Sequence, residues 1–165
     1  MATDKTFAMI ETPKGSRSKF KFDEELKAFR LSNVLAAGSV FPFDFGYLPG
    51  TRGEDGDPLD VLVLLDSPTP MGCLVEVRLL GVITAQQVDE GHRVRNDRII
   101  AAAVKSPSHR RFRALKDLGR SVLEEIEHFF ESYNVFEERP FKILGRGGPA
   151  AAQRLVQAGR ERADQ

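Results

Sequence analysis

Hydrophobic and polar positions alternate in short runs near the start of the chain. Phe7–Glu11 and Lys19–Asp23 both show this pattern, and Pro13 and Gly15 lie between them. A period of two is typical of β-strands, so the two runs predict a strand, a turn and a strand within one sheet. Residues 41–50 are aromatic and interrupted by prolines and glycines, which indicates an irregular buried segment.

The longest alternation predicts a long, half-buried strand from residue 73 to residue 84. Its apolar face would carry Cys73, Val75, Val77, Leu79, Gly81 and Ile83. We therefore expect Cys73 to be a thiol of the core. Residues 85–97 are polar with charges of both signs, which predicts a loop, and residues 98–104 resume as a second apolar strand.

The second half of the chain changes to helical periodicity. From Ser121 onward apolar residues recur at intervals of three and four, at Val122, Leu123, Ile126, Phe129, Phe130 and Tyr133. A short strand over residues 141–144 and a polar, alanine-rich helix over residues 150–162 are expected to follow. The elements predict an α+β fold, a small closed or partly open OB-like β-barrel of about five to seven strands with two main helices packed against it, within a single domain spanning residues 1–165.

Composition narrows the classes of function. Lys plus Arg and Asp plus Glu both number 24, so no global positive field favours nucleic acid. Cys73 is the only cysteine and His92, His109 and His128 are scattered, which argues against an intrachain disulfide and against a zinc site. No signal peptide or membrane span is visible, so we expect a cytoplasmic protein without a membrane partner, in which oxygen atoms hold any metal.

Three aspartates crowd the short stretch before the apolar run at residues 61–65. Asp55, Asp57 and Asp60 would repel one another without a cation between them, and the turn at Gly56 and Pro58 can bring them together. The spacing does not fit an EF-hand, because that loop needs glycine where this chain has Asp60. A solvated acidic turn is the alternative interpretation of these residues alone.

More acids follow in the predicted loop at residues 85–97. Asp89, Glu90 and Asp97 could return to the same end of the barrel as the three aspartates. Carboxylates and water favour Mg²⁺, which is often shared with phosphate oxygens, so the pattern indicates phosphoryl chemistry with several Mg²⁺ ions, or with Mn²⁺ instead.

Basic residues that could neutralise a polyphosphate lie near both predicted strand pairs. Lys19, Lys21 and Arg98 are the candidates, whereas Lys14 and Arg17 are interpreted as solvated turn residues. The chain has no Gly-x-x-x-x-Gly-Lys-Ser/Thr sequence, so the P-loop route to phosphate binding is absent.

These residues together resemble the soluble inorganic pyrophosphatases of the Mg²⁺-dependent barrel-fold family (family I). The similarity covers most of the chain, namely I-E-T-P at 10–13, Lys19, F-P-F-D-F-G-Y-L-P at 41–49, D-G-D-P-L-D-V-L at 55–62, G-V at 81–82, D-E-G at 89–91 and H-F-F-E-S-Y at 128–133. The D-G-D-P-x-D-V-L element is the most specific of these motifs.

The resemblance implies an inorganic diphosphatase that splits pyrophosphate into two phosphates with metal-activated water. It implies that Asp55 and Asp60 bind the metals, with Asp89 across the cleft and Asp97 as a further candidate ligand. Asp57 would help to deprotonate the attacking water. Lys19 and Tyr133 would contact substrate phosphate, alongside Lys21 and Arg98 as candidate substrate-binding residues. A homo-oligomer, hexameric in many bacterial relatives, is implied by the resemblance alone.

Several positions depart from the family pattern where substrate is expected. The changed residues are Lys21 in place of Glu, Asn33 in place of Arg, Phe41 and Phe45 in place of Tyr, Asn96 in place of Asp, and Asn134 in place of Lys. The exchanges at positions 21, 33 and 134 leave the formal charge unchanged, so we hypothesise that Lys21 replaces lost cations. Two other functions stay open, a phosphohydrolase for another phosphoanhydride or ester, and a non-catalytic module that binds pyrophosphate or metal.

Overall fold

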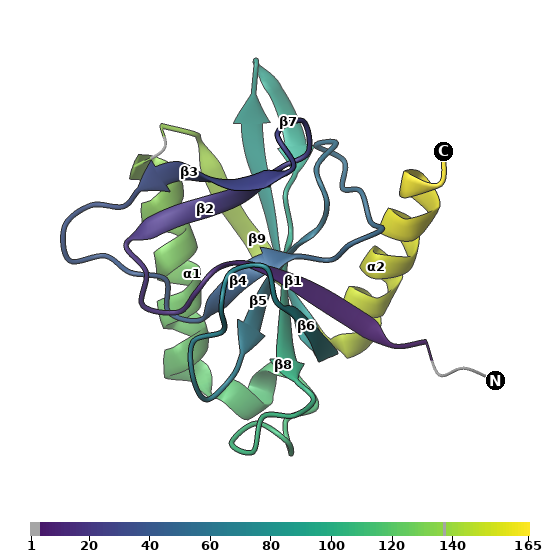
Figure 1. The fold of residues 1–165 in the computed structure, drawn as a ribbon. Helices are drawn as coiled ribbons and strands as arrows, with labels where there is room; N and C mark the ends of the chain where they lie inside the picture. Colours follow the sequence, from purple (N-terminus) through teal and green to yellow (C-terminus); the bar gives the residue numbers. More distant parts are fainter. Residues whose placement is uncertain (1–3, 137) are drawn as a thin grey trace.

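A computed structural model describes residues 4–136 and 138–165 of the chain (Figure 1). Its strands are β1 (Thr6–Thr12), β2 (Ser18–Asp23), β3 (Ala28–Val34), β4 (Asp44–Tyr47), β5 (Asp60–Leu64), β6 (Leu74–Asp89), β7 (His92–Arg95), β8 (Arg98–Ala103) and β9 (Phe141–Gly147). The helices are the 3₁₀ turn η1 (Leu115–Leu118), α1 (Arg120–Phe136) and α2 (Pro149–Ala163).

Five strands pair in a ring. The ring runs β1, β4, β5, β8 and β6, and closes where β6 pairs with β1. Four of its pairings are antiparallel, and β5 with β8 is parallel. Register shifts in the β1–β4 and β6–β8 pairings make the ring irregular, and β7 and β9 extend it from β6. The expected α+β class, an OB-like small barrel with two helices, is confirmed.

The two helices cover opposite faces of the strands, as the alternation along β5 requires (Figure 1). Val61 and Val63 pack in a core cluster with Ala152 and Val156 of α2. Leu62, between these two valines, points to the opposite side of the strand and packs in a second cluster with residues of α1. The amphipathic helix expected from Ser121 is α1, and its apolar face forms this second cluster.

Several expected local features differ from the structure. β1 and β2 belong to separate sheets, because β2 pairs only with β3, which was not expected at all. Residues 85–97 form the end of β6 and the hairpin strand β7 instead of a loop. The segment at 41–50 contains β4, and Cys73 is partly exposed instead of lying in the core.

The acidic turn is held in place by one buried threonine. The Thr51 hydroxyl donates to the carbonyl of Leu48 at 2.6 Å and accepts from the N–H of Leu59 at 3.1 Å. Gly56 adopts a φ of 89°, a conformation that glycine enters without a steric penalty. These contacts place Asp55 and Asp57 between β4 and β5, and Asp60 at the start of β5, at one end of the ring.

Thr51→Val is expected to lower the free energy of unfolding by about 1–2 kcal/mol. The substitution keeps the shape of the side chain but leaves the buried Leu48 carbonyl and Leu59 N–H without this partner. Urea denaturation measures the change. Thr84→Val, on a half-buried strand position, is the matched control and should shift stability by less than about 0.5 kcal/mol. Equal effects of both variants would contradict the prediction.

Within the described residues, no helix is both long enough and apolar enough to cross a membrane.

Candidate active site

One pocket at the mouth of the ring gathers charged side chains from both sheets. Its cavity of about 180 Å³ is bordered by five carboxylates, four cationic side chains, three amides and two tyrosines. These residues are Glu11, Glu24, Asp55, Asp57, Asp60, Lys19, Lys21, Arg98, Arg139, Gln87, Asn96, Asn134, Tyr47 and Tyr133. The pocket therefore matches a small ligand that carries several charges.

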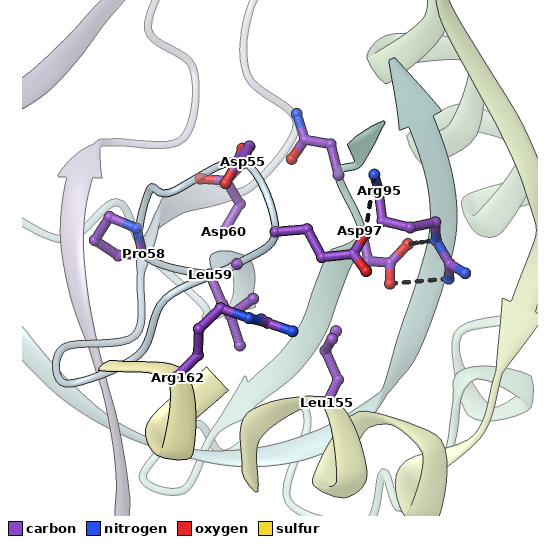
Figure 2. Close-up of a pocket in the computed structure, with 11 residues that line it drawn as sticks. Asp55, Pro58, Leu59, Asp60, Arg95, Asp97, Leu155 and Arg162 are labelled. Carbon is purple, nitrogen blue, oxygen red and sulfur yellow. Dashed lines mark hydrogen bonds and ion pairs between the residues drawn. The ribbon is translucent and has the colours of Figure 1, made fainter. Parts of the chain in front are cut away.

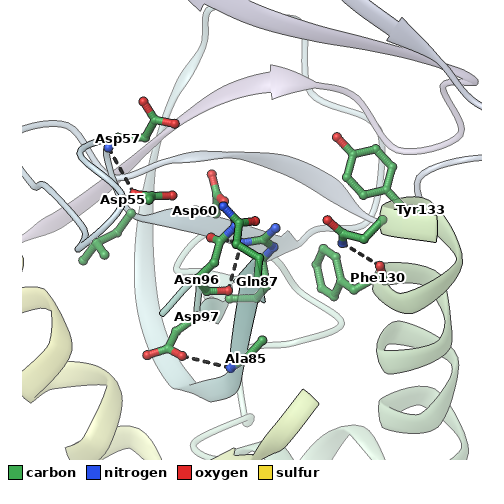
Figure 3. Close-up of polar contacts among 12 residues, drawn as sticks. Asp55, Asp57, Asp60, Ala85, Gln87, Asn96, Asp97, Phe130 and Tyr133 are labelled. Atoms are coloured by element: carbon green, nitrogen blue, oxygen red, sulfur yellow. Dashed lines mark hydrogen bonds and ion pairs between the residues drawn. The ribbon is translucent and has the colours of Figure 1, made fainter. Parts of the chain in front are cut away.

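The acids of the turn lie together on one side of this pocket (Figure 3). The backbone N–H of Asp57 donates to Oδ1 of Asp55 at 3.1 Å, which folds the turn back on itself. Burial raises the pKa of Asp55 from 3.8 to about 6, and repulsion from Asp60 and Asp57 adds to the rise. The ionised turn is thus electrostatically strained, and a cation placed there relieves the strain.

Glu11 on β1 is a further acid of the pocket. Glu11 is only 7 % exposed to solvent, and its Oε2 accepts a hydrogen bond from the backbone N–H of Phe22 at 2.8 Å. Burial raises the pKa of Glu11 from 4.5 to about 7; the Phe22 hydrogen bond opposes this rise, and the charge of Asp60 adds to it. Glu11 therefore titrates near neutral pH.

Arg98 is a buried cation fixed by several contacts. Its guanidinium lies 2.9 Å from Oδ2 of Asp60 and also donates to the carbonyl and side-chain oxygens of Asn96. It stacks against the rings of Phe130 and Phe141 at 5.3 and 5.5 Å from their centroids. The buried Nε lacks a hydrogen-bond partner among the described residues.

The side-chain amides of Asn96 and Gln87 orient Arg98 through a chain of hydrogen bonds. Nδ2 of Asn96 donates to Oε1 of the buried Gln87 at 2.7 Å, while Oδ1 of Asn96 accepts from Arg98 (Figure 3). This chain of hydrogen bonds fixes the orientation of the Asn96 side chain. The result is a guanidinium whose direction depends on a neutral pair instead of on an acid at position 96.

The lysines come from β2, across the pocket from the acidic turn. The ammonium group of Lys21 lies 3.6 Å from Oδ2 of Asp57. Lys19 donates a short hydrogen bond to the hydroxyl of Tyr133 on α1, and its Nζ is 4.7 Å from the centre of that ring. Lys19, Lys21, Arg98 and Tyr133 are therefore brought together with Asp55, Asp57 and Asp60 in one pocket.

Asp97 and Asp89 are not among the residues that line this pocket. Asp97 accepts the N–H of Ala85 at 2.9 Å and pairs with the guanidinium of Arg95 at 3.0 Å. It faces a second pocket, between the acidic turn and α2, that Arg95 and Arg162 also border (Figure 2). Asp89 is exposed at the end of β6, paired in register with His92. Their roles as metal ligands stay predictions.

The donor set suits a hard divalent cation. Among residues 4–136 and 138–165, no three Asp, Glu, His or Cys side chains already converge on one point. Their chemistry nevertheless fits, because carboxylate oxygens are the ligands that Mg²⁺ prefers and because the charge of Asp55 is opposed by Asp60 and Asp57.

Sequence reasoning missed four of the charged or amide groups in the pocket, namely Glu11, Glu24, Gln87 and Arg139. Glu11 lies in the I-E-T-P motif and had no predicted role, although an acid within a predicted half-buried strand is a usable signal. Gln87 and Arg139 gave no signal, because their place in the pocket depends on how β6 and the segment after α1 pack.

The fold and the pocket define a class, an OB-like barrel protein that binds a small, highly charged ligand at the barrel mouth. The model of the family described as "Inorganic pyrophosphatase" matches residues 8–164. The chain therefore belongs to the inorganic pyrophosphatase family, as its motifs predicted.

Individual relatives agree with this assignment. The chain is 40% identical to the inorganic pyrophosphatase of Leifsonia xyli over 152 residues, covering 92% of this chain and 91% of the relative. It is 38% identical to that of Geobacillus stearothermophilus over 149 residues, covering 90% and 88%. The crystal structure of inorganic pyrophosphatase from Thermus thermophilus superposes with a TM-score of 0.91 at 32% identity, covering 99% of this chain and 94% of that chain.

Proposed function

We propose that this protein is an inorganic diphosphatase that hydrolyses pyrophosphate to two phosphates and depends on Mg²⁺. Family membership supports the reaction. The single observation that carries it in this chain is the pocket itself, in which a strained acidic turn faces Lys19, Lys21 and Arg98. Anion and cation sites side by side are what a metal-bound polyphosphate needs.

The acids hold the metal in this proposal. Asp55 and Asp60 are the ligands from the turn, and Asp89 and Asp97 are proposed to join them after their side chains move. When bound, Mg²⁺ lowers the pKa of a coordinated water and neutralises phosphate oxygens. Oδ2 of Asp60 faces Arg98, so its other carboxylate oxygen is the one available to the ion.

The cations and the tyrosine orient the substrate. Lys19 and Tyr133 form one hydrogen-bonded unit that borders the pocket, where both are proposed to contact a phosphate oxygen. Arg98 borders the pocket, and its guanidinium is fixed by Asn96 and two rings. Two phosphoryl groups held in this way lose rotational freedom before the reaction, which lowers the barrier.

Asp57 is the proposed proton acceptor. Its side chain is 61 % exposed at the pocket mouth, so water reaches it freely. It lies beside Asp55 on the same turn, and a water held between the turn and the substrate is within its reach. The proton leaves with Asp57 while the water oxygen attacks phosphorus and the bridging oxygen departs with the second phosphate.

Phosphate release from pyrophosphate tests the proposal. With Mg²⁺ the purified protein is expected to release two phosphates per pyrophosphate, and removal of the metal with a chelator should abolish release until Mg²⁺ or Mn²⁺ is restored. Tripolyphosphate and ATP are the comparison substrates. Faster release from either would indicate a phosphohydrolase of other specificity, and no release from any would indicate a binding module.

The family also supports a cytoplasmic homo-oligomer, with a hexamer as the proposed state. The native mass from sedimentation equilibrium would test the oligomeric state.

A further inference from the structure

Two ion pairs occupy carboxylates of the acidic turn, and they differ in how firmly they are held. The Arg98–Asp60 pair measures 2.9 Å, and its side chains are 5 % and 28 % exposed. The Lys21–Asp57 pair measures 3.6 Å, and its side chains are 44 % and 61 % exposed. Water and salt weaken the second pair, so it is the one that another cation displaces easily.

The strand that carries Lys21 is fixed although its ammonium group is not. The N–H of Phe22 donates to Glu11 at 2.8 Å, and the N–H of Phe20 donates to Oγ1 of Thr12 at 3.0 Å. These contacts tie β2 to β1 on both sides of Lys21. The backbone therefore stays beside the pocket while the four-carbon side chain can change its partner.

We propose that Lys21 is the resident counter-cation of Asp57, that an arriving divalent cation displaces it, and that the released ammonium group then binds substrate phosphate. This inference rests on the proposed function and adds a coupling between its two steps. A cation held by Asp55 and Asp60 repels the neighbouring ammonium group and competes with it for the charge of Asp57, so Lys21 weakens metal binding to the free protein. Once displaced, Lys21 remains at the pocket edge, where the charge of a phosphate group replaces that of Asp57.

The coupling predicts opposite effects of Lys21→Met on the two binding steps. Mn²⁺ binding without substrate, measured by the electron paramagnetic resonance signal of free Mn²⁺, should tighten about twofold to fivefold, the factor by which one exposed ion pair shifts an equilibrium. At saturating metal, the KM for pyrophosphate should rise about tenfold, because one charge-assisted contact is lost. Lys21→Arg should restore both values toward those of the unaltered protein.

Lys5→Met is the matched control. Lys5, just before β1, also forms an ion pair near the surface, at 3.7 Å from Glu76, but borders a different pocket. The Lys5→Met substitution removes the same charge as Lys21→Met and should leave both the Mn²⁺ affinity and the KM for pyrophosphate unchanged. A purely structural role of Lys21 would weaken both steps together.

Unchanged or weaker Mn²⁺ binding in Lys21→Met would overturn the inference. This outcome is separable from failure of the proposed function, since metal binding is measured without substrate and turnover is measured with the unaltered protein. If the unaltered protein hydrolyses pyrophosphate and Lys21→Met binds Mn²⁺ no more tightly, only the coupling fails.

Discussion

Asp57→Asn is expected to lower kcat for pyrophosphate about 10²–10⁴-fold, the range that a positioned general base contributes. The substitution keeps the size of the side chain and removes its ability to accept a proton from water. The backbone N–H of Asp57, which donates to Asp55, is unaffected, so the acidic turn should keep its shape. Phosphate release at saturating Mg²⁺ measures the loss.

Two comparisons separate this loss from a loss of structure. Asp164→Asn changes an exposed aspartate at the end of α2 and should leave kcat within about twofold. Because Asp57 is exposed, urea unfolding of Asp57→Asn should differ from that of the unaltered protein by less than about 0.5 kcal/mol. A kcat within twofold for the stable Asp57→Asn variant would remove Asp57 from the catalytic role.

The acidic turn could be predicted from sequence because its chemistry is local. Asp55, Gly56, Asp57 and Pro58 determine a tight turn within a few residues, and the apolar run after Asp60 marks the strand that anchors it. Neither inference needs a distant part of the chain. The structure then brings the three aspartates to one pocket, as the turn predicted.

Asn96 and Asp97 show where local reasoning ends. Neighbouring residues in an extended chain point to opposite sides, so only one of the two can face the pocket. Asn96 lines the pocket, whereas the Asp97 carboxylate accepts hydrogen bonds from the N–H of Ala85 and from the side chain of Arg95. These contacts of Asp97 depend on how β6 pairs, which the motif alone does not reveal, and its role as a metal ligand stays a prediction.

β3 was missed for a related physical reason. Ala28–Val34 has no fully buried position, because it pairs only with β2 in a separate two-stranded sheet (Figure 1). A strand with two partly exposed faces lacks a clean alternation of apolar and polar residues. Its function is positional, since it supports the strand from which Lys19 and Lys21 reach the pocket.

The metal-free protein is expected to lose stability as pH rises from about 4.5 to 7, and Glu11→Gln is expected to remove much of this dependence. The pKa of Glu11 is raised from 4.5 to about 7 in the folded state, chiefly by burial, so the folded protein holds this proton more tightly than the unfolded chain. The stabilisation is complete below pH 4.5 and is lost by about pH 7, and amounts to at most about 3 kcal/mol. Asp55, with its pKa raised to about 6, adds a smaller change of the same sign.

Urea unfolding with a chelator, between pH 5 and pH 8, measures this effect, and Glu161→Gln on the exposed face of α2 is the control. At pH 8 the Glu11→Gln protein should be the more stable by up to about 3 kcal/mol, since its amide still accepts the Phe22 N–H and carries no buried charge. Equal stability of the Glu11→Gln protein and the unaltered protein at pH 8 would show that the ionised Glu11 side chain does not destabilise the fold. The same strain explains why a buried acid suits this pocket, because a bound cation stabilises its charged form and so couples metal binding to the fold.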